Sequence, residues 1–248
     1  MRKLTKKQKR ILDQNLQQQK ERLKINFDLN CVKPMTEKQQ QMFDSFDINN
    51  CLFLAGSAGT GKTFISLYKA LKAVLIDEQY SKIIIIRSTV PTRDVGFLPG
   101  SVQDKIEQYE LPYKQLVNKL FQRDDAYQYL KQRQIIQFQS TSFIRGQEFN
   151  DCICICDECQ NMDFDELATI ITRSGNNIKL IMIGDPRQSD FRNNNQKYRS
   201  DILKFINILK EINQIKVIKF DHNDIVRSTI CKQFIIQCEK HSIYALQV

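Results

Sequence analysis

Short apolar runs alternate with segments of helical periodicity from about Pro34 onward. The runs lack strict polar alternation, which is typical of parallel strands buried on both faces. Helical periodicity fills stretches between several of them, for example 63–75 and 201–212. The pattern therefore predicts an α/β domain, with a mostly parallel sheet and helices on both of its faces. The six runs are CLFLA (Cys51 to Ala55), IIIIRS (Ile83 to Ser88), IIQFQ (Ile135 to Gln139), CICIC (Cys152 to Cys156), IKLIMI (Ile178 to Ile183) and IKVIKF (Ile215 to Phe220).

A glycine-rich loop follows the first run directly. Open α/β sheets bind ligands beyond the carboxyl ends of their strands, so this is where chemistry is expected. The sequence GSAGTGKT fits Gly-x-x-x-x-Gly-Lys-Thr, with a buried run before it and a helical pattern after it. We expect Lys62 to reach the β- and γ-phosphates of a nucleotide and the Thr63 hydroxyl to bind Mg²⁺. The predicted nucleotide site consists of Gly56, Ser57, Ala58, Gly59, Thr60, Gly61, Lys62 and Thr63.

Polar residues follow two further runs. Asp157 and Glu158 end CICIC, and GDPRQ, ending in Gln188, follows IKLIMI. In a phosphate-loop protein the first acid holds the metal and the next can polarise the attacking water. We therefore predict Asp157 as a magnesium ligand, Glu158 as the catalytic base and Gln188 as a sensor of the γ-phosphate. The alternatives are two exposed acids at a strand end and an ordinary turn.

Four of the eight cysteines lie between Cys152 and Cys159, and Cys156 and Cys159 have the Cys-x-x-Cys spacing of a metal or redox site. A closed zinc site needs four converging ligands. The chain has no second Cys-x-x-Cys pair and only two histidines, His222 and His241. We therefore interpret these cysteines as packing residues of a buried strand.

Composition sets the size and surroundings of the domain. A chain of 248 residues with 42% hydrophobic and 26% charged residues is sufficient for one sizeable α/β domain. No apolar run approaches the ~20 residues that span a bilayer. The basic N-terminus has no apolar segment typical of a secretory signal. We expect a cytoplasmic protein without a membrane partner.

The positive charge is concentrated at one end. Nine Lys or Arg residues and two acids lie between Met1 and Lys24, which accounts for most of the net charge of +9. We predict a basic, Gln-rich arm over 1–33 and an ATPase domain over 34–248. The arm is either a contact for phosphate backbones or a solvated tail.

The chain also contains several longer motifs: MTEKQ (Met35 to Gln39), GSAGTGKT, IIIIRSTVPTRDVGFLPGS (Ile83 to Ser101), FIRGQEFND (Phe143 to Asp151), DECQN (Asp157 to Asn161), GDPRQSDF (Gly184 to Phe191) and DIVRS (Asp224 to Ser228). Together they resemble the PhoH family of ATPases, in the form that bacteriophages carry, so the host cytoplasm is the expected location if a phage encodes the protein. The resemblance covers about Pro34 to Lys240 and implies a RecA-like P-loop NTPase fold, similar to the first motor domain of superfamily 1 helicases. One departure is Cys159, where alanine is usual.

The resemblance implies two further site residues. Gln39 matches a glutamine that reads the adenine edge, so ATP is expected rather than GTP; an amide suits this because it both donates and accepts. Arg227 matches an arginine near the γ-phosphate, supplied in cis or from a neighbouring subunit.

The sequence thus predicts a magnesium-dependent ATPase that acts as a helicase-like motor or remodeller on RNA, or on single-stranded DNA. The resemblance also implies a homo-oligomeric ring, with a hexamer as one form. The strand contact is expected between the second and fourth runs, unless the basic residues there are solvated helix faces. These residues are Arg87, Arg93, Lys105, Lys114, Lys119 and Arg123.

Three other functions remain open. A ribonuclease would need a separate carboxylate cluster for its metals, for which Asp124 and Asp125 are the only candidate pair. A binding switch with slow hydrolysis would have little use for Glu158 as a base. A small-molecule kinase would leave GDPRQ without a purpose.

Overall fold

The computed structural model describes residues 14, 17–19, 21–89, 102–187 and 195–241, which form one α/β domain. The strands are β1 (Cys51–Gly56), β2 (Lys82–Arg87), β3 (Ile136–Ser140), β4 (Cys152–Asp157), β5 (Ile178–Gly184) and β6 (Ile215–Phe220). The helices are α2 (Glu37–Ile48), α3 (Lys62–Leu75), α4 (Val102–Phe121), α5 (Ala126–Gln132), α6 (Phe164–Thr172), α7 (Asn195–Lys210) and α8 (Thr229–Lys240), with short 3₁₀ turns η1 (Thr141–Phe143), η2 (Cys159–Asn161) and η3 (His222–Asp224).

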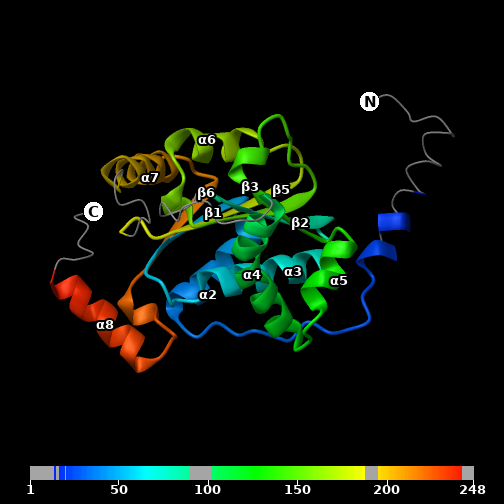
Figure 1. The fold of residues 1–248 in the computed structure, drawn as a ribbon, viewed down its shortest axis with the longest axis horizontal. Coiled ribbons are helices and arrows are strands. Elements are labelled where there is room, and N and C mark those ends of the chain that lie inside the picture. Colours follow the sequence, from blue (N-terminus) through cyan, green and yellow to red (C-terminus); the bar gives the residue numbers. More distant parts are fainter. Residues whose placement is uncertain (1–13, 15–16, 20, 90–101, 188–194, 242–248) are drawn as a thin grey trace.

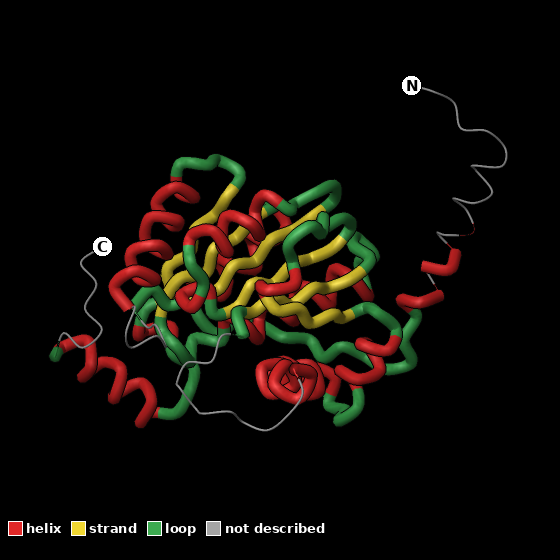
Figure 2. The backbone as a smooth tube through the Cα atoms, turned by 45° about the horizontal axis from the view of Figure 1, so that its top comes forward, coloured by secondary structure: helices red, strands yellow, loops and turns green. Residues whose placement is uncertain are grey.

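The six strands form one sheet (Figure 2). Their order is β3-β2-β4-β5-β1-β6, and every pair is parallel. All six predicted strands are confirmed, with bounds that differ by no more than one residue. The register places Arg87 beside Asp157, and Ala55 beside Gly184. The carboxyl ends of β1, β2, β4 and β5 therefore meet at one edge of the sheet.

Helices cover both faces of the sheet, as predicted (Figure 1). Alternate residues of each strand point to opposite faces. On β1, Leu52 and Leu54 join the core formed with α2, α3, α4 and α5, whereas Phe53 joins the core formed with α6 and α7. Strands buried on both sides explain why the runs are almost continuously apolar.

Local sequence signals fix where two of the helices begin. The Thr36 side chain accepts from the Gln39 N–H at the start of α2. Asp163 and Glu166 form a capping box at the start of α6. Both arrangements satisfy N–H groups that a helix end leaves without partners.

Part of the N-terminal arm lies against α4 and α5. Leu23 is buried in the core on that side of the sheet. The Arg133 guanidinium donates to the Lys24 carbonyl at 2.6 Å, and the Phe27 ring packs on Phe121 at 5.0 Å between centroids. Contact with the domain thus begins before Pro34, and the boundary at 33/34 stays a prediction. Among the described helices, none has the length and apolar character needed to cross a membrane.

Candidate functional site

The loop between β1 and α3 closes tightly around its own backbone. Gly56 has a φ of 131°, and a Cβ there would lie 1.9 Å from the Phe220 carbonyl oxygen, so only glycine fits. Gly61 has a φ of 79° and forms the N-cap of α3. The loop therefore leads directly into the positive end of a helix, where backbone N–H groups are available to an anion.

Lys62 is held by oxygen atoms of this loop. Its ammonium donates to the carbonyls of Gly56 at 2.7 Å and Ser57 at 2.6 Å, and to the Thr60 hydroxyl at 3.1 Å. Burial lowers the pKa of Lys62 to about 8, although the carboxylates of Asp185 and Asp157 oppose this shift. The positive charge is thus placed beside the loop at an energetic cost, which an anion in the cavity would relieve.

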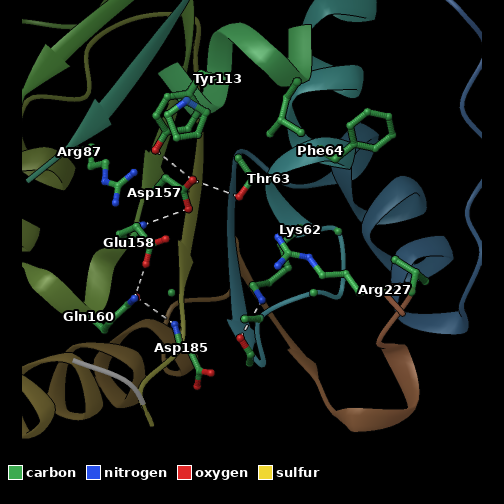
Figure 3. Close-up of a pocket in the computed structure, with 18 of the residues that line it drawn as sticks. Lys62, Thr63, Phe64, Arg87, Tyr113, Asp157, Glu158, Gln160, Asp185 and Arg227 are labelled. Carbon is green, nitrogen blue, oxygen red and sulfur yellow. Dashed lines mark hydrogen bonds between the residues drawn. The ribbon is translucent and has the colours of Figure 1, made fainter. Parts of the chain in front are cut away.

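Thr63 and Asp157 meet across the gap between α3 and β4. The Thr63 hydroxyl donates to Asp157 Oδ2 at 3.1 Å, and the backbone N–H of Glu158 donates to Oδ1 at 3.0 Å. Glu158 has a φ of 57°, a left-handed conformation at the point where the strand ends. Figure 3 shows the Glu158 side chain beside Asp157 at the same edge of the sheet.

These two oxygen groups fit a magnesium ion. Mg²⁺ prefers hard oxygen ligands and usually combines one or two carboxylates with waters and substrate phosphates. A hydroxyl and a carboxylate in hydrogen-bond contact supply such a partial ligand set. The described residues contain no group of three or more His, Cys, Asp or Glu placed to hold a metal by themselves.

A chain of hydrogen bonds connects Glu158 back to the phosphate loop. The Gln160 amide donates to Glu158 Oε2 and accepts from the Asp185 N–H at 3.0 Å. Asp185 in turn accepts from Arg187 Nε at 2.9 Å, and Arg187 donates to the Ser57 hydroxyl. The end of β5 is therefore tied to both the acidic strand end and the loop.

A cavity of about 750 Å³ lies over these residues. One wall consists of the phosphate loop and the ends of β4 and β5. The opposite wall comes from α4 and the first turn of α3, and it consists of Phe64, Pro112, Tyr113, Leu116 and Lys119. The Lys119 ammonium lies 5.6 Å from the centre of the Phe64 ring. This second wall is mostly apolar, with a cation at its rim.

Tyr113 connects the α4 wall to Asp157. Its hydroxyl donates to Asp157 Oδ2 at 3.1 Å. Burial raises the pKa of Tyr113 well above its usual value, and the charge of Asp157 raises it further, so the phenol stays protonated. Arg87, at the end of β2, lies beside Tyr113, Asp157 and Glu158 (Figure 3).

The structure places Gln39 directly behind the phosphate loop. Gln39 is 2% exposed; its amide donates to the Thr60 carbonyl at 2.9 Å and accepts from the Met35 N–H at 2.8 Å. Met35 lines the cavity.

Arg227 reaches the same cavity from the loop after η3. Its side chain lies against Gly59 and points across the loop toward Lys62 (Figure 3). The Val226 N–H donates to the Gly59 carbonyl at 3.0 Å, which fixes that approach.

One of the sequence predictions lies away from this site, and two fall outside the described residues. Gln188 lies outside the described residues, as does Arg93. Asp125 pairs with Arg123 on the surface, and neither it nor Asp124 lines the cavity.

Sequence reasoning missed four residues of the site: Tyr113, Gln160, Asp185 and Arg187. Gln160 had a usable signal, because it lies two positions after Glu158 and a 3₁₀ turn there returns its side chain to the glutamate. Tyr113 had none, since its partner Asp157 is 44 positions away.

The three cysteines of β4, and Cys159 of η2, face the core, not the cavity. Cys152, Cys154, Cys156 and Cys159 are buried on the α6 and α7 side of the sheet. The Cys159 thiol donates to the Cys156 carbonyl at 3.3 Å. Burial raises the pKa of Cys156 and of Cys159, so both remain neutral thiols.

Comparison with known proteins gives a consistent result. The family model described as PhoH-like protein matches residues 31–239. The PhoH-like protein of Mycobacterium leprae (strain TN) is 31% identical over 218 residues, which cover 86% of this chain and 60% of that protein. Protein PhoH of Escherichia coli (strain K12) is 30% identical over 210 residues, covering 83% of this chain and 58% of that protein.

The similarity is limited in length for the curated relatives and in degree for the solved structure. The chain spans about three fifths of the length of the curated relatives that it matches. Among solved structures, it is similar to the Pif1 helicase from Candida albicans at 16% identity and a TM-score of 0.36, over 84% of this chain and 44% of that chain. A likeness at this level carries no conclusion about function.

Proposed function

Because the chain belongs to the PhoH family, we propose that it is a magnesium-dependent ATPase that remodels or moves along RNA. The observation that carries the proposal is the meeting of Lys62, Thr63, Asp157 and Glu158 around one cavity. Each has the chemical character that phosphoryl transfer to water requires. The fold brings them together from two separate parts of the chain, 62–63 and 157–158.

The phosphate loop would bind the triphosphate through its N–H groups at the start of α3. Lys62 would move its donors from the loop carbonyls to the β- and γ-phosphates. This exchange is favourable because a buried ammonium gains an anionic partner in place of neutral ones. Thr63 and Asp157 would hold magnesium, which neutralises charge on the phosphates when bound.

Glu158 is proposed as the base that orients the attacking water. Its left-handed backbone directs the side chain toward the cavity side of the sheet edge, where Gln160 holds it. Arg227 would stabilise charge on the transferring phosphoryl in cis, a role that its placement beside Gly59 supports. Gln188 is proposed as the γ-phosphate sensor.

Gln39 is proposed to read adenine. An amide has two N–H donors and two acceptor sites, so Gln39 can contact a base while keeping its bonds to the Thr60 carbonyl and from the Met35 N–H. Its position next to the phosphate loop favours this role over a purely structural one, because a base bound there would lie near Met35 at the rim of the cavity.

RNA is proposed as the macromolecular partner. The basic segment before residue 25 and the exposed Lys114 and Lys119 of α4 provide positive charge for phosphate contacts. A homo-oligomeric ring is proposed as the active form, because the resemblance to the family implies one. The exposed Ile230 and Phe234 of α8, 79% and 63% exposed, offer an apolar surface for a second copy.

An ATPase assay with and without single-stranded RNA and DNA tests the proposal, with a native mass measurement of the same sample. We expect magnesium-dependent turnover that RNA accelerates more than DNA does. Turnover that no strand accelerates would favour an ATP-dependent switch. Absence of turnover with either would refute the proposed ATPase, and a monomeric mass under turnover conditions would refute the ring.

A further inference from the structure

Asp157 accepts hydrogen bonds from three different elements. Oδ1 accepts from the Glu158 N–H at 3.0 Å, just after β4. Oδ2 accepts from Thr63 in α3 and from Tyr113 in α4, both at 3.1 Å (Figure 3). The first two donors belong to the phosphate-loop arrangement described above. The third comes from a helix that the loop motif does not include.

A carboxylate needs such partners to keep one orientation. The terminal torsion of an aspartate side chain is broad, so covalent preference does not fix the plane of its carboxyl group. Hydrogen bonds must therefore fix it. For Oδ2, the Thr63 hydroxyl is itself a ligand candidate, and its geometry changes when a metal binds. Tyr113 is the one side-chain donor to Asp157, among the contacts of the described residues, that a metal would leave in place.

Tyr113 is well suited to hold an orientation. It is 1% exposed, and its ring packs against Phe138 of β3 with centroids 5.7 Å apart. Arg87 also lies beside the hydroxyl (Figure 3). The hydroxyl thus faces a cation and an anion, which favours donation of its proton to the carboxylate rather than elsewhere.

We propose that Tyr113 is a positioning residue for the metal site: it holds the Asp157 carboxylate in the orientation that binds magnesium, and so makes α4 part of that site. This inference rests on the proposed function. Outer partners of metal-binding carboxylates typically change metal affinity or activity by 10- to 100-fold when removed. A phenylalanine at position 113 would keep the ring packing and remove only the donor.

The chain offers a matched control in Tyr127. Tyr127 is also 1% exposed, and its hydroxyl donates to a carboxylate, Glu110, at 2.6 Å. Glu110 pairs with Lys131 and serves the contact between α4 and α5. Tyr127→Phe therefore removes the same kind of bond, a phenol donating to a carboxylate, from the contact between α5 and α4, without touching the cavity.

The test compares wild type, Tyr113→Phe and Tyr127→Phe by binding of ADP with a fluorescent ribose label. Affinity is measured in EDTA and then as a function of Mg²⁺, and Mn²⁺ binding in the presence of ADP is followed by its electron paramagnetic resonance signal. We expect Tyr113→Phe to raise the half-saturating metal concentration about 10-fold and to leave the affinity in EDTA unchanged. Tyr127→Phe should match wild type in both measurements.

Three outcomes separate the possibilities. A metal dependence of Tyr113→Phe equal to that of wild type would overturn the positioning role. An equal loss of affinity with and without metal would reduce Tyr113 to a packing residue, and Tyr113→Met repeats the test should the phenylalanine variant fail to fold. If wild type itself binds no ADP under any condition, the proposed ATPase fails instead of this inference.

Discussion

Two buried lysines lie at opposite ends of the sheet and make similar contacts. Lys62, beyond the carboxyl end of β1, and Lys179, near the start of β5, are 8% and 5% exposed. Each donates to two main-chain carbonyls, and burial lowers the pKa of each. Each also lies near an aromatic ring, that of Phe220 or of Phe46.

Their surroundings differ in one respect. Lys62 borders a 750 Å³ cavity, with Asp157, Glu158 and Asp185 as the acidic groups that face it. Lys179 donates to the carbonyls of Phe46 and Asn49, at the carboxyl end of α2, a helix with no basic residue in its last turn. The first lysine has room for a ligand and the second completes a helix end. A buried cation therefore indicates function only together with an open space beside it.

Replacement of Lys62 should have the largest effect. We expect Lys62→Ala to lower ATP turnover by at least about 100-fold, because a donor aimed at developing charge in a dry site is worth this much. The thermal midpoint of this variant should not fall. Water from the cavity can hydrate the loop carbonyls that lose their donor, and the variant no longer buries an ammonium group. A phosphate-release assay and a thermal scan measure both.

Lys69→Ala is the matched control for this variant. Lys69 lies on the same helix but pairs with Asp47 at the surface. It should retain full turnover. If Lys62→Ala kept wild-type turnover, Lys62 would have no more functional importance than Lys179, and the comparison of these two buried lysines would fail.

Replacement of Glu158 should come second, because it removes a base but no phosphate contact. Glu158→Gln should lower turnover by about 100-fold or more, as expected for a general base, while ATP binding is kept. Gln160 can still hold a glutamine at this position through an amide contact. Equilibrium binding of labelled ATP, run beside the turnover assay, separates the two effects. Undiminished turnover would require a different base.

The carboxyl edge was largely predictable because its signals are local in sequence. Continuous apolar runs indicated six parallel strands, and GSAGTGKT and Asp157-Glu158 adjoin two of them. The α4 wall was not predictable in the same way. Helix α4 contains Pro112, a residue that usually interrupts a helix, and Tyr113 acquires its partner only when β2, β4 and α4 pack together.

Lys179 shows the same limit at the other end of the sheet. In IKLIMI it interrupts an apolar run, and no local pattern relates it to the end of α2. Its partners Phe46 and Asn49 are 133 and 130 positions away. Long-range contacts of this kind depend on the order of the strands in the sheet, and local residue patterns do not determine that order.

Replacement of Lys179 should affect stability instead of turnover. Lys179→Met keeps most of the side-chain volume but leaves two carbonyls without their donor, so we expect a loss of roughly 2 kcal/mol in the free energy of unfolding. For a domain of this size, that corresponds to a fall of about 4–8 °C in the thermal midpoint. Turnover per folded molecule should stay at the wild-type level, which an assay well below the midpoint measures. A loss of turnover without a loss of stability would place Lys179 in the functional region.

Turnover should likewise be unaffected by the loss of two thiols, those of Cys156 in β4 and Cys159 in η2. Strand β4 runs from one region to the other. Cys156 directly precedes Asp157. A double change of Cys156 and Cys159 to alanine therefore tests whether the part of β4 before Asp157 is needed for ATP turnover. Both thiols face the α6 and α7 core, and their removal should cost about 1 kcal/mol each in stability, as small cavities do.

ATP turnover of the double variant should stay unchanged, because neither sulfur faces the cavity and each is a neutral, buried thiol. Cys231→Ala, a partly exposed position on α8, controls for the loss of a thiol as such. Elemental analysis for zinc accompanies both variants. Loss of turnover together with loss of zinc would mean that the Cys-x-x-Cys pair is a metal site, and that the functional region extends one residue further into the strand than Asp157.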